Sequence, residues 1–357
     1  MHERGPIHVV DRLAPGGIET LVLDMLGAGS EQRVFSLQGE TKALVEHWRA
    51  LDRYSDRIDA FSKGMGIEPS LVLRLTRRLR ALAPRAVILH HVGPLLYGGI
   101  AARLANIGRI IHVEHDVWHY SESPRHRTLL TITERLIRPR HIAVSSKAGD
   151  VIRAIVPGAR IAVVPPGIDT DRFRPRDKQA ARARLGLSET RRLIGTAGRL
   201  ATVKQQSLML EALVKIAPDV DAAIAGSGPE LEPLTELAKN LGLSGRVHFL
   251  GQRADLEEVL PAFDVFCLPS KAEGLPRSVL EAQACGVPVV ATDVGALDEA
   301  VSRETGRLVP IGDAAALADA LTVILEAAPS VEKSRQHVLD SYSLEGTLRS
   351  YERVISE

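Results

Sequence analysis

The sequence predicts an α/β protein built from two doubly wound domains that face each other across a cleft. Three observations carry this prediction: the length of the chain, the alternation of short apolar runs with longer helical patterns, and a single turn-rich break. The 357 residues exceed what one hydrophobic core usually organises. Continuous apolar runs are typical of strands buried on both faces, and their alternation with helices is typical of a parallel sheet.

The predicted strands are short β-branched or apolar runs. In the first half of the chain they are Ile7–Val10, Val34–Leu37, Ala86–Leu89, Ile110–Val113 and Ile142–Val144. In the second half they are Leu193–Ala197, Ala222–Ala225, Val247–Leu250, Val265–Leu268 and Val287–Ala291. The helical patterns that separate them include Ile18–Leu26, Pro69–Leu82, Leu95–Ala105, Ser207–Ile216 and Glu230–Leu241.

One segment has the composition of a domain linker. The run Val164-Pro165-Pro166-Gly167-Ile168-Asp169 is rich in turn-forming residues, and the charged stretch 171–176 follows it. We therefore place the first domain at residues 1–168 and the second at 169–340. Residues 1–168 carry more basic than acidic side chains and the remainder carries more acidic ones, which suggests different partners for the two domains. The alternative is a difference in charge between two solvated surfaces that is unrelated to partners.

Composition excludes several classes of protein. Hydrophobic residues make up 45% and charged residues 25%, an ordinary globular balance. The net charge of +1 and the absence of aromatic–basic motifs argue against nucleic-acid binding. No apolar stretch approaches the roughly 18 residues of a membrane-spanning helix, and the residues before Ile7 lack the apolar core of a signal peptide. Because Cys267 and Cys285 have neither metal nor redox spacing, we expect a cytoplasmic protein.

The densest pattern of candidate ligand-binding residues follows the predicted strand Val265–Leu268. Glu273 lies in the loop after this strand, a helix can begin near Pro276, and Glu281 lies more than one turn into that helix. A helix N-terminus offers free N–H groups and a partial positive charge, which suits a phosphate. The two carboxylates can each accept paired hydrogen bonds from the hydroxyls of a ribose or a hexose.

A second pattern supplies positive charge. The segment Gly198-Arg199-Leu200 and Lys204 follow the predicted strand Leu193–Ala197, so both cations lie at the carboxyl end of a strand. A diphosphate leaving group needs positive charge where negative charge develops, and fixed side chains can provide it without a metal.

Three further candidates lie after strands of the first domain. Gly16 and Gly17 would let backbone amides approach a ligand closely. The run Glu114-His115-Asp116 follows the strand Ile110–Val113, and His91 follows Ala86–Leu89. An isolated histidine is more often structural than catalytic, but position after a parallel strand favours a role at a site.

These residues together resemble a known family. Glu273, seven intervening residues and Glu281, with Gly274-Leu275-Pro276 between them, are similar to the donor motif of retaining glycosyltransferase family four, of the bacterial group 1 type. The family has the GT-B fold, two Rossmann-like domains facing across a cleft. The resemblance implies that the first domain holds the acceptor, that the second binds a nucleotide sugar, and that a C-terminal helix, residues 341–357, packs back on the first.

The resemblance also assigns roles to the second-domain residues. Glu273 would contact the donor sugar, the amides of Gly274, Leu275 and Pro276 would contact sugar and phosphate, and Glu281 would bind the ribose. Arg199 and Lys204 would contact the diphosphate. The residue after this lysine is commonly glycine in the family but is Gln205 here, so the sequence departs from the family pattern at this position of the loop.

In the first domain, the resemblance places Gly16 and Gly17 against the donor phosphate. His115 would meet the donor sugar near the acceptor, and His91 matches a second family histidine less closely. Asp116 is a neighbour that could contact sugar or acceptor.

The function predicted from these residues is retaining transfer of a sugar from a nucleoside diphosphate donor to a glycan, lipid-linked or small-molecule acceptor. The residues expected to act in catalysis are Arg199, Lys204, Glu273 and His115. No cofactor and no metal are expected. The alternatives are an epimerase or hydrolase of the same fold, and a non-catalytic protein that binds sugar nucleotides.

The sequence also contains two weaker patterns. Gly226-Ser227-Gly228 lacks the third glycine and the distant acidic residue of a dinucleotide-binding fingerprint, which argues against an NAD enzyme. The segment Pro69–Leu82 reads as a basic amphipathic helix that could lie on an anionic membrane. The alternative for this helix is a core-facing element with a solvated arginine face.

Overall fold

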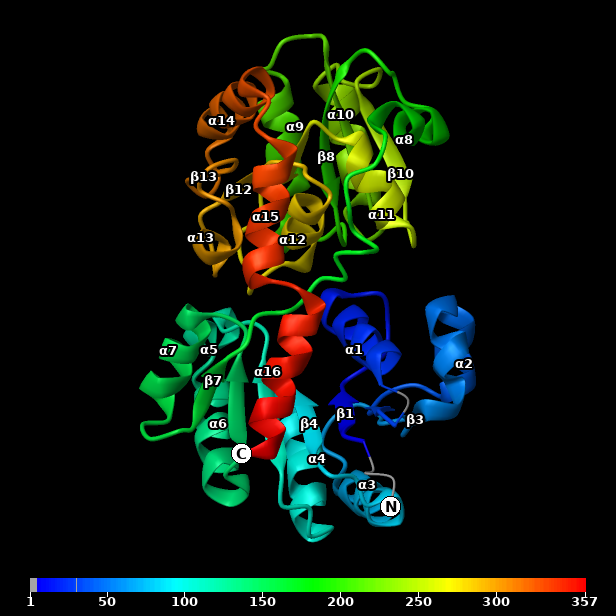
Figure 1. The fold of residues 1–357 in the computed structure, drawn as a ribbon, viewed down its shortest axis with the longest axis vertical. Coiled ribbons are helices and arrows are strands. Elements are labelled where there is room, and N and C mark those ends of the chain that lie inside the picture. The colour runs from blue at the N-terminus through cyan, green and yellow to red at the C-terminus, as the bar shows by residue number, and fades with distance from the viewer. Residues whose placement is uncertain (1–4, 30) are drawn as a thin grey trace. The chain divides into compact units, whose positions relative to one another are not determined.

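The computed structural model describes residues 5–29 and 31–357, and contacts divide the chain into two compact units (Figure 1). Unit 1 runs to Pro166 and includes Thr347–Glu357, and unit 2 comprises Gly167–Gly346. Each unit is a parallel sheet with helices on both faces, so the predicted fold class is confirmed.

The sheet of unit 1 has seven strands within the described residues, in the order β3-β2-β1-β4-β5-β6-β7. The strands are β1 (Ile7–Val10), β2 (Arg33–Ser36), β3 (Ile58–Ala60), β4 (Val87–His90), β5 (Ile110–Glu114), β6 (Arg140–Ala143) and β7 (Ile161–Val163). The helices are α1 (Gly17–Ala28), α2 (Thr41–His47), α3 (Pro69–Leu82), α4 (Val92–Leu104), α5 (Trp118–Glu122), α6 (Pro124–Ile137), α7 (Ser146–Ile155) and the short η1 (Arg49–Arg57).

Alternate residues of the unit 1 strands enter different cores, because successive side chains point to opposite faces. Val9 and Phe35 pack with α3, α4 and α6, whereas Val10 and Val34 pack with α1, α2 and η1. Both faces of the sheet are therefore buried, which explains why these strands read as continuous apolar runs.

Unit 2 repeats this plan with six strands in the order β10-β9-β8-β11-β12-β13 among the residues described. The strands are β8 (Arg192–Ala197), β9 (Val220–Ala225), β10 (Val247–Gly251), β11 (Val265–Leu268), β12 (Val289–Thr292) and β13 (Arg307–Val309). The helices are α8 (Lys178–Leu185), α9 (Gln206–Leu213), α10 (Leu231–Asn240), α11 (Leu256–Val259), α12 (Arg277–Ala284), α13 (Leu297–Ala300), α14 (Ala314–Ala327) and α15 (Val331–Ser341), with the short η2 (Thr202–Lys204) and η3 (Leu260–Ala262).

The last helix, α16 (Leu344–Ser356), contacts unit 1 over most of its length. Glu352 forms an ion pair with Arg85, and Glu357 forms one with Arg140 at 2.7 Å. At the start of the helix, the hydroxyl of Thr347 donates to the carbonyl of Pro165 at 3.0 Å. These contacts join the end of the chain to the sheet formed by its beginning.

The strand order reverses once in each sheet, between β1 and β4 in unit 1 and between β8 and β11 in unit 2. On either side of such a switch point, connections leave the carboxyl ends of the strands in opposite directions, and ligands of open α/β sheets bind there. The loops after β1, β4, β8 and β11 carry Gly16–Gly17, His91, Arg199 and Glu273 respectively.

Candidate active site

Lys204 and Glu273 form the centre of the candidate site in unit 2. The Lys204 ammonium lies 2.6 and 2.8 Å from the two carboxylate oxygens of Glu273, and the Ser270 hydroxyl donates to the same carboxylate at 2.6 Å. The amide of Lys271 donates to the carbonyl of Val203 at 2.8 Å, which ties the two loops together. Only 7% of the Glu273 side chain is exposed, so little water screens the attraction between its carboxylate and the Lys204 ammonium.

The loop of Arg199 rests on the loop after β9. Gly226 and Gly228 adopt φ of +159° and +153°, and a Cβ atom there would lie 1.9 Å from the carbonyl oxygen of Gly198 and 2.2 Å from that of Leu200. Only glycine fits so close a backbone approach. The glycine pair that looked like part of a dinucleotide fingerprint thus supports the loop that carries Arg199.

Gln205 occupies the position where the resemblance predicts glycine. Gln205 adopts φ +47° and ψ +43°, a left-handed backbone conformation that residues other than glycine seldom adopt. The loop therefore keeps a glycine-type backbone without a glycine. Arg199 is exposed, and its carbonyl accepts a hydrogen bond from the Gln206 amide at 3.1 Å.

Glu281 lies in the second turn of α12 and faces Arg277, which was not among the predicted site residues. The Arg277 guanidinium lies 3.6 Å from a Glu281 carboxylate oxygen and donates to the carbonyl of Gly167 at 2.8 Å. Both residues are 6% exposed. The four-residue spacing on one helix was a signal for this pair.

The residues between the two glutamates form the start of α12. Pro276 is its N-cap residue, Leu275 is buried, and the carbonyl of Gly274 accepts from the amide of Ala296 at 3.0 Å. A Cβ atom on Gly295 would lie 2.2 Å from the carbonyl oxygen of Glu273, so the loop is held against the segment that follows β12.

In unit 1, α1 begins at Gly17, directly after its N-cap residue Gly16. A Cβ atom on Gly16 would lie 2.4 Å from a carboxylate oxygen of Glu19, so the absence of a side chain makes room for this carboxylate at the start of the helix. Partial burial raises the pKa of Glu19. Glu19 was not among the predicted site residues, although it lies next to the glycine pair in sequence.

His91 forms a charged cluster with residues at the end of β5. Its Nδ1 lies 3.0 Å from Glu114, which is fully buried and also accepts from the hydroxyl of Tyr120 at 2.5 Å. The Nε2 of His91 lies 3.9 Å from Asp116. Burial alone would lower the pKa of His91, but the hydrogen bond to Glu114 and the charges of Glu114, Asp116 and Asp11 raise it to about 9. His91 also adopts φ +71°, a strained backbone of the kind that clusters at functional sites.

The structure therefore places two predicted histidines together. The rings of His91 and His115 lie 5.3 Å apart between centroids, and His115 is 8% exposed. Asp116 accepts a hydrogen bond from His119 at 2.9 Å, which adds another imidazole to the cluster. The neighbours Glu114 and Asp116 differ in their environments: Glu114 is buried beneath His91, whereas Asp116 is half-buried.

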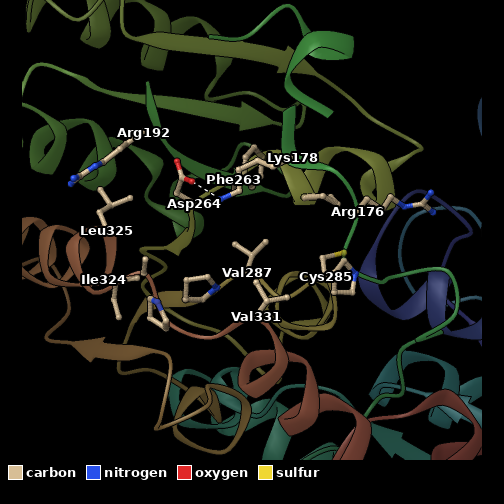
Figure 2. Close-up of a pocket in the computed structure, with 16 residues that line it drawn as sticks. Arg176, Lys178, Arg192, Phe263, Asp264, Cys285, Val287, Ile324, Leu325 and Val331 are labelled. Atoms are coloured by element: carbon tan, nitrogen blue, oxygen red, sulfur yellow. Dashed lines mark hydrogen bonds and ion pairs between the residues drawn. The ribbon is translucent and has the colours of Figure 1, made fainter. Parts of the chain in front are cut away.

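A pocket of about 340 Å³ lies at the opposite edge of the unit 2 sheet (Figure 2). Its lining includes Arg192, Asp264 and Val287, which stand at the amino ends of β8, β11 and β12. Asp264 forms ion pairs with Lys178 at 2.7 Å and Arg182 at 2.6 Å. This pocket contains none of the predicted donor-site residues.

No group of three or more histidine, cysteine, aspartate or glutamate side chains is arranged to hold a metal ion within 5–29 and 31–357. Asp-x-Asp, a sequence that can bind a metal ion, occurs twice, and in each case one aspartate bonds to groups of the protein. Asp169 accepts from the amides of Asp171 and Arg172, and the buried Asp221 forms an ion pair with Arg191 at 2.8 Å.

Three of the four arginines on α3 bond within unit 1. Arg74 pairs with Glu68, Arg78 pairs with Asp59, and Arg80 donates to the carbonyl of Leu104. The structure thus gives these arginines intramolecular roles, and contact with anionic lipid stays a prediction. Among the described helices none is long and apolar enough to span a membrane alone, and the pair α14 and α15, bent by 109°, meets the criteria of length and composition together.

Two doubly wound units with charged loops at both switch points define the GT-B class of fold, and solved structures agree. The Anabaena protein HepE in complex with UDP is 21% identical, with a TM-score of 0.85 and 99% of each chain covered. Its complex with UDP-glucose is 23% identical, with a TM-score of 0.84 over 99% of each chain. A glycosyltransferase from Rickettsia africae is 20% identical, with a TM-score of 0.81, over 99% of this chain and 98% of that one. At these identities the likeness concerns the fold.

Sequence comparison identifies the family. Residues 177–338 match Glycosyl transferases group 1, and residues 15–172 match Glycosyltransferase Family 4. The chain belongs to the group 1 glycosyltransferases of family four, which confirms the resemblance. It is 39% identical over 216 residues to the D-inositol 3-phosphate glycosyltransferases of Mycobacterium tuberculosis and Mycobacterium bovis. That match covers 56% of this chain but only 45% of the length of these relatives.

The raised pKa of His91 predicts how stability depends on pH. A pKa above the ordinary value of 6.5 means that protonated His91 stabilises the folded state fully below pH 6.5 and that this stabilisation is lost as pH rises through about 9. A His91→Gln variant keeps an N–H donor for Glu114 but does not titrate. We expect wild type to exceed it in unfolding free energy by roughly 1–3 kcal/mol at pH 6, and the difference to shrink towards pH 10. Urea unfolding across this range measures it, and a difference independent of pH would contradict the charged cluster.

Proposed function

We propose that this protein is a retaining, metal-independent glycosyltransferase that moves a sugar from a nucleoside diphosphate donor to a hydroxyl acceptor. The observation that carries the proposal is the Lys204–Glu273 pair at the switch point of β8 and β11, beside the loop of Arg199. A cation for the diphosphate and a carboxylate for sugar hydroxyls lie within hydrogen-bonding distance of each other. Family membership supports glycosyl transfer as the reaction class.

In the proposed mechanism, Arg199 and Lys204 neutralise the charge that develops on the departing diphosphate. The bond between the anomeric carbon and the phosphate oxygen breaks while the acceptor oxygen bonds to the same carbon from the same face. The proton of the acceptor hydroxyl passes to the leaving phosphate oxygen, so no second carboxylate is needed to remove it. Lys204 donates to Glu273 in the structure, and a bound diphosphate would replace that carboxylate as its partner.

We propose UDP-sugars as the first donors to test, because the fold neighbour HepE is described in complex with UDP and with UDP-glucose. For the acceptor, the name of the curated relatives suggests a phosphorylated polyol, and the excess of basic residues in 1–168 suits an anion. A glycan or a lipid-linked acceptor is the other class to test.

A product assay separates this function from its rivals. An epimerase converts the donor sugar without an acceptor, a hydrolase releases free sugar, and a sugar-nucleotide sensor leaves the donor intact. Incubation of wild type with UDP-glucose, with and without inositol phosphate, and analysis of all products by NMR distinguishes these outcomes. Retention of the anomeric configuration in a transfer product would support the proposed stereochemistry.

The first prediction concerns the two cations. Arg199→Ala or Lys204→Ala should each lower turnover about 100-fold or more, the effect of losing one contact to a developing charge. The exposed Lys215, also in unit 2, provides a matched control, since Lys215→Ala removes one positive charge outside the site. Steady-state kinetics with saturating donor measures the effect. If a folded variant at 199 or 204 turns over like the control, that residue has no part in the mechanism.

The second prediction separates the two glutamates. Glu281→Ala should weaken binding of UDP, because the ribose is present in UDP and in the donor. Glu273→Gln should leave UDP affinity unchanged or higher, since Lys204 loses a competing carboxylate, yet it should impair use of the intact sugar donor. Calorimetric titration of UDP and kinetics with UDP-glucose test both. Equal losses of UDP affinity in the two variants would contradict the assignment.

A further inference from the structure

Three histidines and one glutamine form a continuous hydrogen-bonded chain inside unit 1. The Nε2 of His8 lies 3.1 Å from the side-chain oxygen of Gln32, and the Nδ1 of His8 lies 3.0 Å from the Nε2 of His90. The Nδ1 of His90 lies 2.8 Å from the Nε2 of His115. We call Gln32, His8, His90 and His115 the histidine relay.

The relay is buried and its rings are aligned. His8 on β1 and His90 on β4 are each 1% exposed, and they occupy the two strands at the switch point. Successive rings are stacked, with planes 19° and 25° apart and centroids 5.3 and 5.1 Å apart. Burial lowers the pKa of His8 to about 4 and that of His90 well below its ordinary value, so both rings are neutral near pH 7.

The amide oxygen of Gln32 sets the direction of every hydrogen bond in the relay. A carbonyl oxygen only accepts, so the proton of His8 is on Nε2 and its Nδ1 accepts from His90. A neutral His90 then carries its proton on Nε2, and its Nδ1 accepts from His115. The Nε2 of His115 is therefore a donor directed into the unit.

We propose that His8 and His90 are positioning residues that hold His115 as its Nε2–H tautomer, so that its Nδ1 accepts a hydrogen bond from a hydroxyl of the donor sugar. This inference rests on the proposed function and on the expectation, implied by the family resemblance, that His115 meets that sugar. It deepens the function by giving the contact a direction: the sugar hydroxyl donates and the imidazole accepts. His8 and His90, which lie in the core of unit 1 on β1 and β4, thereby determine whether His115 donates or accepts at the site.

The direction of the contact can be read with modified donors. Replacing the contacted hydroxyl by fluorine leaves an acceptor but removes the donor, whereas replacing it by hydrogen removes both. If His115 accepts, fluoro and deoxy donors lose kcat/KM to the same extent, about tenfold or more, for one position of the sugar. If His115 donates, the fluoro donor is used better than the deoxy donor.

The tautomer itself is measured without any substrate. Two-bond ¹⁵N–¹H NMR spectra of the full chain, with the His115 signals assigned from a His115→Asn variant, report which ring nitrogen carries the proton. We expect Nε2–H for His115 in wild type at pH 7.5. A neutral His115 protonated on Nδ1 would overturn the inference.

Variants that act at a distance test the relay. Gln32→Met removes the terminal acceptor at a half-buried position and should let His115 become a mixture of tautomers, while Gln32→Glu keeps an acceptor and should preserve Nε2–H. His90→Phe removes the direct partner of His115, so it should give a larger fraction of the other His115 tautomer than Gln32→Met does. It should also lower kcat/KM for the donor about tenfold and leave the affinity for UDP unchanged. His141→Gln is the matched control, because His141 is equally buried in the same sheet but bonds to Glu134 and His112 instead.

The outcomes separate the inference from the proposed function. Unchanged His115 tautomers in both Gln32→Met and His90→Phe would overturn the relay even if transfer activity is found. Conversely, if wild type transfers no sugar from any nucleotide donor, the proposed function fails while the tautomer measurement still stands. A change of tautomer in His141→Gln as large as that in Gln32→Met would also overturn the relay, since it would reflect general loosening of the sheet.

Discussion

Reversal of strand order in an all-parallel sheet is the constraint on which the rest of this structure depends. Because every strand in a sheet runs the same way, all carboxyl ends meet at one edge, and the loops diverge only where the order reverses. In unit 1 that point brings the loop of Gly16 beside the loop of His91, and in unit 2 it brings the loop of Arg199 beside the loop of Glu273. The glycines at 226 and 228 then let a third loop approach the backbone at 198 and 200 and support it.

Opposite charges are paired at both switch points. Lys204 is held by Glu273, and His91 is held by Glu114. Such pairing offsets the desolvation of each charge and fixes the side chain in one orientation, so little reorganisation is needed when a diphosphate or a sugar hydroxyl replaces one partner. The relay through His8 and His90 fixes a site residue in a similar way, because its hydrogen bonds determine which ring nitrogen of His115 carries the proton.

The sequence predicts much of the fold and site because both depend on local pattern. Strands such as Val265–Leu268 were found with the same bounds, whereas the three-residue edge strands β3, β7 and β13 were missed. A charged residue interrupts β3 and begins β13, and β7 directly precedes the proline-rich segment that was assigned to the linker. The predicted site residues follow strands, where position alone is informative. Arg277 and Glu19 were missed although each lies within four residues of a predicted site residue. The relay partners were missed for another reason: the contacts of His8 with Gln32 and His90 span 24 and 82 residues and exist only through strand pairing.

Binding of a nucleoside diphosphate in the absence of metal tests the central claim most directly. The account predicts that UDP, or GDP if the nucleobase differs, binds wild type saturably at a single site by calorimetry in excess EDTA. Addition of magnesium should leave the affinity unchanged, since Arg199, Lys204 and backbone amides supply the positive charge. The account would be contradicted if neither nucleotide bound in EDTA and magnesium or manganese restored binding.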